Sequence, residues 1–251
     1  MIDRSIYKGS FDKNQMNNNW RCPRCNAGIL HFKEEKVIEE VNADTIEWEK
    51  VDPDSFHWQV HSSFVYTTLL FCSNEECNEK VICSGSSFID IYDSKQDSEG
   101  NVENLYQKYY KPLFFHPIIN IFNIPQNTPE EVKENIIKSF STFFSDYESS
   151  ANSLRVALEC IINELNENPE LSKLHKKIEK LATPKYDNIR DKCMALKWLG
   201  NDGSHCGDKK ITDTDILNGY DILSFVLKEL YEEKNETLTE IVKKINTKKG
   251  V

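Results

Sequence analysis

Apolar and polar residues alternate along much of the first 110 residues, which is the pattern of half-buried strands. The alternation is clearest over residues 56–71. Residues 37–51 predict a hairpin, and residues 81–92 predict a pair of strands broken at Gly85. Residues 93–104 are polar and predict a loop. Together these segments predict a small antiparallel β unit.

Beyond residue 128 the apolar positions recur every three or four residues, as they do in amphipathic helices. Thr128, Pro129 and Glu131 predict the first helix start, with the threonine as cap and the glutamate bonding back to it. The pattern then predicts one long helix to about residue 165, or two helices with a kink near Ser149 and Ser150.

Three further helices are predicted over residues 170–181, over residues 186–199 and from about residue 212, the second of them ending at Gly200. Helices joined by short loops form a bundle. We therefore expect an α+β fold in two domains. A β domain would span residues 1–110 and a helical bundle residues 111–251.

Charge divides unevenly between the two predicted domains. The chain has 31 basic and 41 acidic residues, a net charge of -10. Residues 1–110 hold 11 basic and 19 acidic residues, a net -8, which leaves -2 for the remainder. Phosphate attraction needs a basic field, so the whole surface does not suit non-specific nucleic-acid binding and only a local basic patch could provide it.

No apolar run approaches the roughly 18 residues that would span a membrane, and the first thirty residues do not resemble a secretory signal. The sequence therefore predicts a cytoplasmic protein with no membrane association. In a reducing compartment the eight cysteines are expected to be metal ligands or buried thiols rather than disulfides.

Four cysteines form two closely spaced pairs in the predicted β domain. Cys22 and Cys25 enclose two residues, and Cys72 and Cys77 enclose four. Four thiolates suit tetrahedral zinc, so we predict one structural zinc ion per chain and no open coordination position. Cys83 is a rival fourth ligand, although its apolar strand favours a buried thiol. The alternative is a set of unrelated reduced cysteines.

Three motifs in the helical part resemble a known family. Residues 154–159 (LRVALE), the Ile-Pro-x3-Pro pattern at 124–129 and residues 200–205 (GNDGSH) are similar to the domain of unknown function 4145 family. That family is grouped with the HEPN (higher eukaryotes and prokaryotes nucleotide-binding) superfamily, and an N-terminal C-P-x-C zinc ribbon often accompanies it. The resemblance covers residues 109–232.

The resemblance implies a HEPN-like bundle that commonly dimerises and serves bacterial anti-phage defence or restriction systems. Active HEPN members are metal-independent endoribonucleases with an arginine, a polar neighbour and then a histidine. By position, His205 matches the histidine and Asn201 the polar neighbour, whereas Gly200 stands where the arginine is expected. Histidine can move a proton near neutral pH, but glycine cannot hold a phosphate as a guanidinium does.

Other cations could form a composite site near that loop. Lys197 precedes Gly200 by one helical turn, Arg190 lies about two turns earlier still, and Arg155 with Glu159 lies on the preceding long helix. Arg155 and Glu159 are equally compatible with a structural ion pair. His205 is equally compatible with a loop residue near a helix end.

Three functions follow from these observations. The first is a non-catalytic adaptor that binds RNA or nucleotide, or dimerises, and acts as a homodimer or with a defence-system partner protein. The alternative is a metal-independent endoribonuclease with a degenerate or composite site around His205. The third is an interaction module without nucleic acid. The absence of the motif arginine favours the first over the second.

Overall fold

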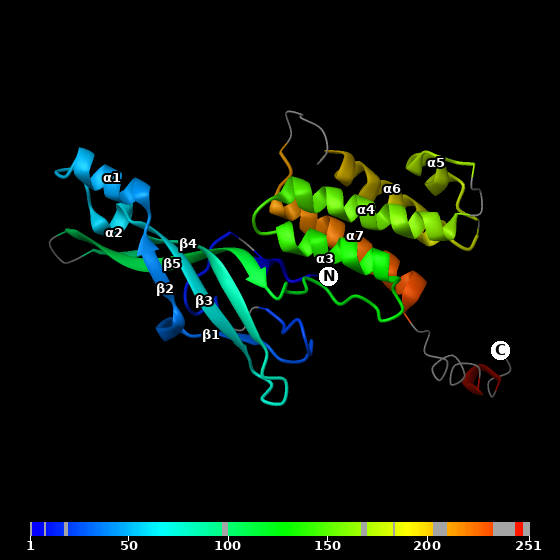
Figure 1. Ribbon diagram of the computed structural model, residues 1–251, viewed down its shortest axis with the longest axis horizontal. Coiled ribbons are helices and arrows are strands. Elements are labelled where there is room, and N and C mark those ends of the chain that lie inside the picture. Colours follow the sequence, from blue (N-terminus) through cyan, green and yellow to red (C-terminus); the bar gives the residue numbers. More distant parts are fainter. Residues whose placement is uncertain are drawn as a thin grey trace.

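The computed structural model of the chain describes residues 2–7, 9–17, 20–96, 100–166, 170–182, 184–202, 210–232 and 244–247. An antiparallel sheet occupies the N-terminal half and helices dominate the C-terminal half, which confirms the α+β fold. The sheet lies at one end of an elongated molecule and the helices that follow it in the chain lie at the other (Figure 1). Among the described helices, none is long and apolar enough to cross a membrane.

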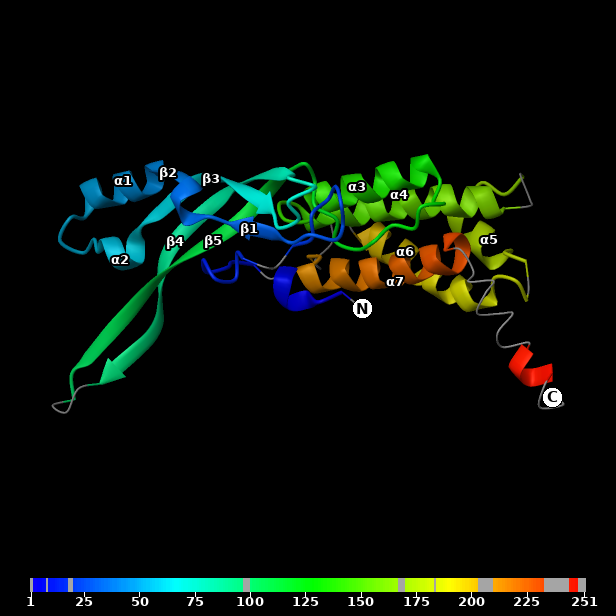
Figure 2. The same cartoon turned by 90° about the horizontal axis from the view of Figure 1, so that it is seen from below.

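The sheet has five strands in the order β1-β3-β4-β5, and β2 also pairs with β3. Its strands are β1 (Leu30–Phe32), β2 (Ile38–Val41), β3 (Ser63–Cys72), β4 (Lys80–Gln96) and β5 (Val102–His116). Strand β3 pairs with β4 only as far as Phe88, so beyond that residue β4 and β5 continue as a two-stranded arm (Figure 2). Strand β5 also crosses residue 110, where the sequence divides in composition.

Two expectations for this region are wrong in detail. Strand β4 continues through Gly85, where its pairing with β5 shows only a local irregularity. Glycine is required there, because a Cβ would lie 2.1 Å from the backbone oxygen of Lys111 on β5. The polar segment at 93–104 is mostly strand, since β4 reaches Gln96 and β5 begins at Val102. Regular pairing between the two strands overrides the polarity of their side chains.

The hairpin predicted for residues 37–51 is also wrong. Strand β2 is followed by helix α1 (Ala43–Val51), because the Asn42 side chain accepts a hydrogen bond from the Thr45 backbone N–H at 2.9 Å and caps the helix. Helix α2 (Trp58–His61) takes up the start of the predicted strand at 56–71, which begins instead at Ser63.

The sheet is followed by helices α3 (Glu130–Thr142), α4 (Tyr147–Leu165), α5 (Leu174–Glu179), α6 (Asp187–Asp202) and α7 (Asp213–Tyr231), and residues 244–247 form a further short helical segment. The hydroxyls of Ser139, Ser150 and Tyr220 are buried and lie 2.9–3.0 Å apart, and they join α3, α4 and α7 by hydrogen bonds. Apolar side chains fill the rest of this core.

The helix ends differ from the predicted ones at several places, and the helix predicted over residues 170–181 covers only Leu174–Glu179. Pro129, not Thr128, holds the cap position of α3. The long helix is two helices, but the break falls at residues 143–146, where Asp146 caps α4 by accepting a hydrogen bond from the Ser149 backbone N–H at 3.0 Å. Helix α6 passes Gly200 and ends at Asp202, so Asn201 lies in its last turn.

An aromatic junction joins the sheet to the helices. Phe144, between α3 and α4, lies against Tyr7, Trp20 and Phe115, with ring centroids 6.3, 6.4 and 4.9 Å away. The core is therefore continuous from sheet to helices, and the two units rest against each other.

A salt bridge adds a second link between the two units. The N-terminal Arg4 pairs with Asp221 of α7 at 2.7 Å, and the backbone N–H of Ile2 donates to the same carboxylate.

Candidate metal centre and helix-end site

The structure brings together the four cysteines that the sequence predicts as metal ligands. The Sγ atoms of Cys22 and Cys77 lie 3.7 Å apart, as do those of Cys25 and Cys72, and all four lie within 4.8 Å of one another. A Zn–S bond of about 2.3 Å gives a tetrahedron with edges of about 3.8 Å. The arrangement therefore fits a closed four-thiolate metal site.

Two loops of similar design carry these cysteines. The first precedes β1 and the second joins β3 to β4. In each loop an asparagine follows the second cysteine in the left-handed conformation, Asn26 with φ 53° and Asn78 with φ 50°. Asparagine adopts this conformation at lower cost than most residues. Both loops can therefore turn back sharply and present their sulfurs to a common centre.

Backbone N–H groups point at two of the sulfurs. The N–H of Gly28 donates to Cys25 Sγ at 3.3 Å, and the N–H of Asn74 donates to Cys72 Sγ at 3.4 Å. The Gly28 bond lowers the pKa of the Cys25 thiol to about 6, whereas burial raises that of Cys72 to about 12. A bound cation would favour the thiolate form that metal binding requires.

Gly28 is a part of this centre that the sequence analysis missed. A Cβ at this position would lie 2.4 Å from Cys72 Sγ, so only glycine lets the two loops approach as they do. No local signal distinguishes this glycine from one in an ordinary turn, because the clash is with a residue 44 positions later in the chain.

Cys83, the rival fourth ligand, is not part of the cluster. Its buried Sγ lies 3.5 Å from the Tyr66 hydroxyl, and burial raises its pKa to about 12. Among the described residues, the four cysteines form the one group arranged to hold a metal ion.

The second candidate site lies at the end of α6. A Cβ at Gly200 would lie 2.3 Å from Arg155 Cβ on α4. The backbone of α6 at Gly200 therefore packs directly against the Arg155 side chain. Arg155 pairs with Glu159 at 2.9 Å, which partly neutralises its charge. His205 lies outside the described residues, so its geometry relative to these groups stays a prediction.

The two cations of α6 that the sequence suggests for a composite site differ in their surroundings. Lys197 is 91% buried (9% exposed), and its Nζ lies 3.4 Å from the centre of the Trp198 ring. Arg190 pairs with Asp187 at 3.0 Å and donates to the Leu181 carbonyl at 2.8 Å. Ten residues of helix separate Arg190 from Gly200, on the order of 15 Å. The structure therefore places Arg190 away from the helix end.

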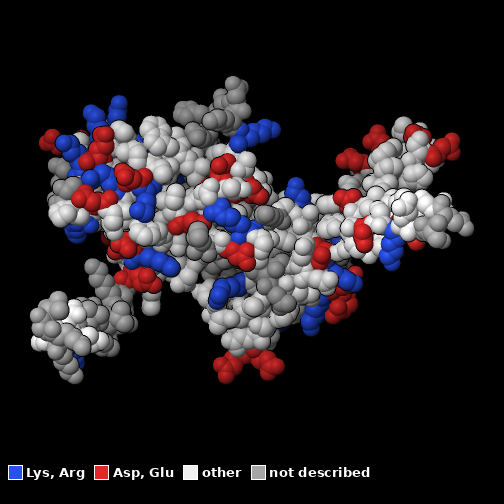
Figure 3. All heavy atoms as spheres, turned by 180° about the vertical axis from the view of Figure 1, so that it is seen from behind, with Lys and Arg blue, Asp and Glu red and all other residues white. Residues whose placement is uncertain are grey.

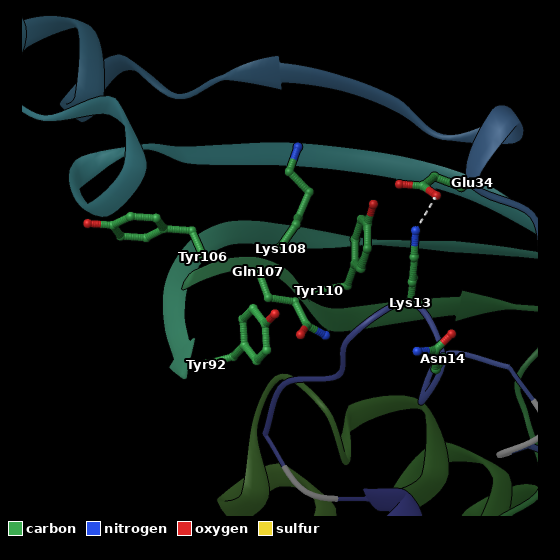
Figure 4. A pocket seen from close by; sticks show the side chains of 8 residues that line it. All are labelled: Lys13, Asn14, Glu34, Tyr92, Tyr106, Gln107, Lys108 and Tyr110. Carbon is green, nitrogen blue, oxygen red and sulfur yellow. Dashed lines mark hydrogen bonds and ion pairs between the residues drawn. The ribbon is translucent and has the colours of Figure 1, made fainter. Parts of the chain in front are cut away.

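A cavity of about 340 Å³ lies beside β5, between the sheet and the N-terminal segment (Figure 4). Tyr92, Tyr106 and Tyr110 line it with Lys13 and Lys108. Lys13 pairs with Glu34 at 3.3 Å and Lys108 pairs with Glu39, so carboxylates of the chain already engage both cations. The cavity was not predicted from the sequence.

Fold and site together define an α+β protein with a four-cysteine centre in its sheet unit and a helical unit behind it. Residues 138–248 match the model of the Domain of unknown function (DUF4145), which supports the family expected from the helical motifs. Residues 9–115 match a second family, Domain of unknown function (DUF8608), which the sequence analysis did not anticipate. Searches of curated proteins and of solved structures found no match.

Proposed function

We propose that this chain is a non-catalytic adaptor of a bacterial anti-phage defence or restriction system. It binds RNA or nucleotide phosphate at the end of α6 and acts as a homodimer or with a partner protein. The resemblance of the helical motifs to HEPN-like proteins motivates this assignment, and the charge distribution agrees with it. The helical unit is nearly neutral, so it repels phosphate far less than the acidic sheet unit does.

Lys197 is the observation that carries the proposal. Most of the Lys197 side chain is buried, and Lys197 forms no ion pair with any carboxylate in the described parts of the chain. The Trp198 ring supports the cation by a cation–π contact. A phosphate oxygen is the kind of ligand that would complete this site.

The packing at Gly200 supports a binding role over catalysis. The motif arginine has no room at this position, because even a Cβ would overlap Arg155. Arg155 itself is engaged by Glu159. A phosphorane would thus lack the guanidinium that active members use for charge stabilisation.

Binding is tested by titrating fluorescently labelled single-stranded RNA or nucleotide with the full chain. We expect Lys197→Gln to weaken binding by roughly 10–100-fold, the effect of losing one charge-assisted hydrogen bond. The matched control is Lys192→Gln on the same helix, whose Nζ lies 4.6 Å from the Phe225 ring centre and also donates to the Asn188 carbonyl. Equal binding by the Lys197 variant and wild type would contradict the proposal.

The same preparation tests catalysis. RNA incubated with the zinc-loaded chain, without added divalent metal, is expected to stay intact. Cleavage under these conditions that disappears in His205→Ala would establish the endoribonuclease instead.

We further propose that the metal is zinc, one ion per chain, and that its role is structural. The four clustered sulfurs would fill all four positions of a tetrahedral ion, which would leave no position for a substrate or water. Metal analysis should give one zinc per chain in wild type and in Cys83→Ala, and clearly less in Cys22→Ser. A zinc content unaffected by Cys22→Ser would rule this out.

A further inference from the structure

The segment between β2 and β3, residues 42–62, forms a small helical projection that we name the α1–α2 lobe. Strands β2 and β3 pair directly with each other, so a short turn would be enough to join them. The lobe instead extends from one end of the molecule (Figures 1 and 2). Its buried residues are Thr45 and Ser62, and none of its apolar side chains is buried.

Aromatic side chains gather on this lobe without cover. Trp48 is 42% exposed and Trp58 is 43% exposed. Phe56 contacts both, with ring centroids 5.9 and 5.3 Å away, and the His61 ring lies tilted against Trp48 with centroids 4.0 Å apart. Clustered exposed aromatics of this kind mark interaction surfaces, and tryptophan is among the residues that contribute most to binding.

The lobe is strongly acidic as well as aromatic. Lys50 is its one lysine or arginine, against five acidic residues, Asp44, Glu47, Glu49, Asp52 and Asp54. Red Asp and Glu side chains are visible on the lobe at the upper right of Figure 3. This charge repels nucleic acid and anionic membranes, so the complementary partner is a basic protein surface.

The chain carries such a surface at its other end. Helix α5 and its flanks present Lys173, Lys176 and Lys180 to solvent, and over residues 170–181 four lysines outnumber the two acids Glu170 and Glu179, a net charge of +2. Beside them Trp198 is 53% exposed, with its ring centroid 6.2 Å from that of His175 on α5. This end therefore offers positive charge next to an exposed aromatic ring, the complement of the lobe.

We propose that the α1–α2 lobe of one copy docks on the α5 surface of a second copy. The two surfaces lie at opposite ends of the molecule, so one chain cannot join its own (Figure 1). Two copies side by side in opposite directions would make the contact twice and close, whereas end-to-end copies would form an open chain. Both assemblies use the same contact, and neither depends on RNA binding.

The test is sedimentation velocity of the full, zinc-loaded chain without nucleic acid, over a range of protein concentrations. We expect the average mass to rise with concentration and to fall between about 0.05 and 0.5 M salt, since salt screens contacts between charged surfaces. The observed mass also distinguishes the closed pair from the open chain. A monomer at all concentrations would overturn the proposal.

Charge reversal identifies the surfaces. The lobe variant is Glu47→Lys with Asp52→Lys and Asp54→Lys, which changes the net charge of the lobe from -4 to +2, and the α5 variant is Lys176→Glu with Lys180→Glu, all at exposed positions. Each variant alone is expected to be monomeric, and an equal mixture of the two is expected to associate again because opposite charges then meet.

The control for the acidic side is Glu130→Lys with Glu134→Lys, which reverses two exposed charges on α3 and should leave association unchanged. Trp58→Ala should weaken association without altering charge. Circular dichroism confirms that each variant is folded. Association that survives both the lobe and the α5 reversals would show that another surface is used, or that a different partner belongs on the lobe.

Discussion

Two glycines determine how closely separate parts of the chain approach. Gly28 lets the first cysteine loop reach Cys72, and Gly200 lets α6 lie against Arg155 on α4. A Cβ at either position would overlap the neighbouring side chain. Glycine is therefore needed at both positions for close packing, and not for an unusual backbone conformation.

Gly28→Ala is expected to damage the metal centre. The added methyl would displace Cys72 Sγ, and disturbing the groups around a metal ligand typically weakens metal affinity by roughly 10–100-fold. Competition with a chromophoric zinc chelator measures the affinity. Gly100→Ala is strained by its φ of 90°, but it lies in the β4–β5 turn away from the cysteines and should keep wild-type zinc affinity. Equal affinities in all three proteins would show that the loops can adjust.

Gly200→Arg is expected to destabilise the chain without creating nuclease activity. Overpacking a close helix contact costs about 1–3 kcal/mol, and α4 would have to move to admit the side chain. Chemical denaturation measures the loss, and Asn201→Ala in the same helical turn is the control. A stable Gly200→Arg variant that cleaves RNA would contradict both the packing argument and the non-catalytic assignment.

For single residues, the sequence predicts metal ligands better than it predicts which residues contact one another. The four cysteines could be found because closely spaced thiols are recognisable as ligands wherever they occur. Gly28 could not be found, and neither could the engagement of Arg190 by Asp187 and the Leu181 carbonyl, because each depends on which segments the fold brings together.

Helix and strand boundaries depend on caps and pairing partners. The periodic spacing predicts α3, α4, α6 and α7, because each buries one apolar face. It fails for α1, which buries no apolar residue and begins where Asn42 caps it. An exposed helix carries little periodic signal, so its sequence was interpreted as a hairpin.

Asp146→Ala is expected to destabilise the start of α4 by about 1 kcal/mol at neutral pH, the usual effect of losing a cap. Hydrogen bonds from the Ser149 hydroxyl and backbone N–H lower the pKa of Asp146 below its ordinary value of 3.8. A lowered pKa stabilises the folded state above the ordinary value, and this contribution is lost as pH falls through the lowered one.

The difference between variant and wild type should therefore shrink in acid. Denaturation followed by circular dichroism at several pH values measures it. Glu148→Ala removes another exposed acid from the same first turn and should cost only a few tenths of a kcal/mol. A pH-independent difference for Asp146→Ala would mean that the cap does not act through its charge.

For the whole molecule, the aromatic junction decides whether the sheet and the helices behave as one body. Composition and charge predict the two units, but the sequence does not predict their contact. Tyr7, Trp20 and Phe144 resemble any other aromatic residues of the chain until the fold places their rings together.

Phe144→Ala is expected to uncouple the two units. Losing this half-buried ring should cost about 1–2 kcal/mol and broaden or split a single unfolding transition in calorimetry. Phe225→Ala on α7, which is 39% exposed and far from the junction in sequence, is the control and should keep one transition. Two transitions already present in wild type would show that the junction does not couple the units.

The aromatic junction also limits how the two halves of this gene could recombine with other genes. Trp20 and Phe115 fall in the segment that matches one family, and Phe144 falls in the segment that matches the other. A fusion that exchanged either half would leave aromatic rings exposed to water unless the new half supplied a matching surface. Either half could therefore be exchanged only together with the residues that form this junction.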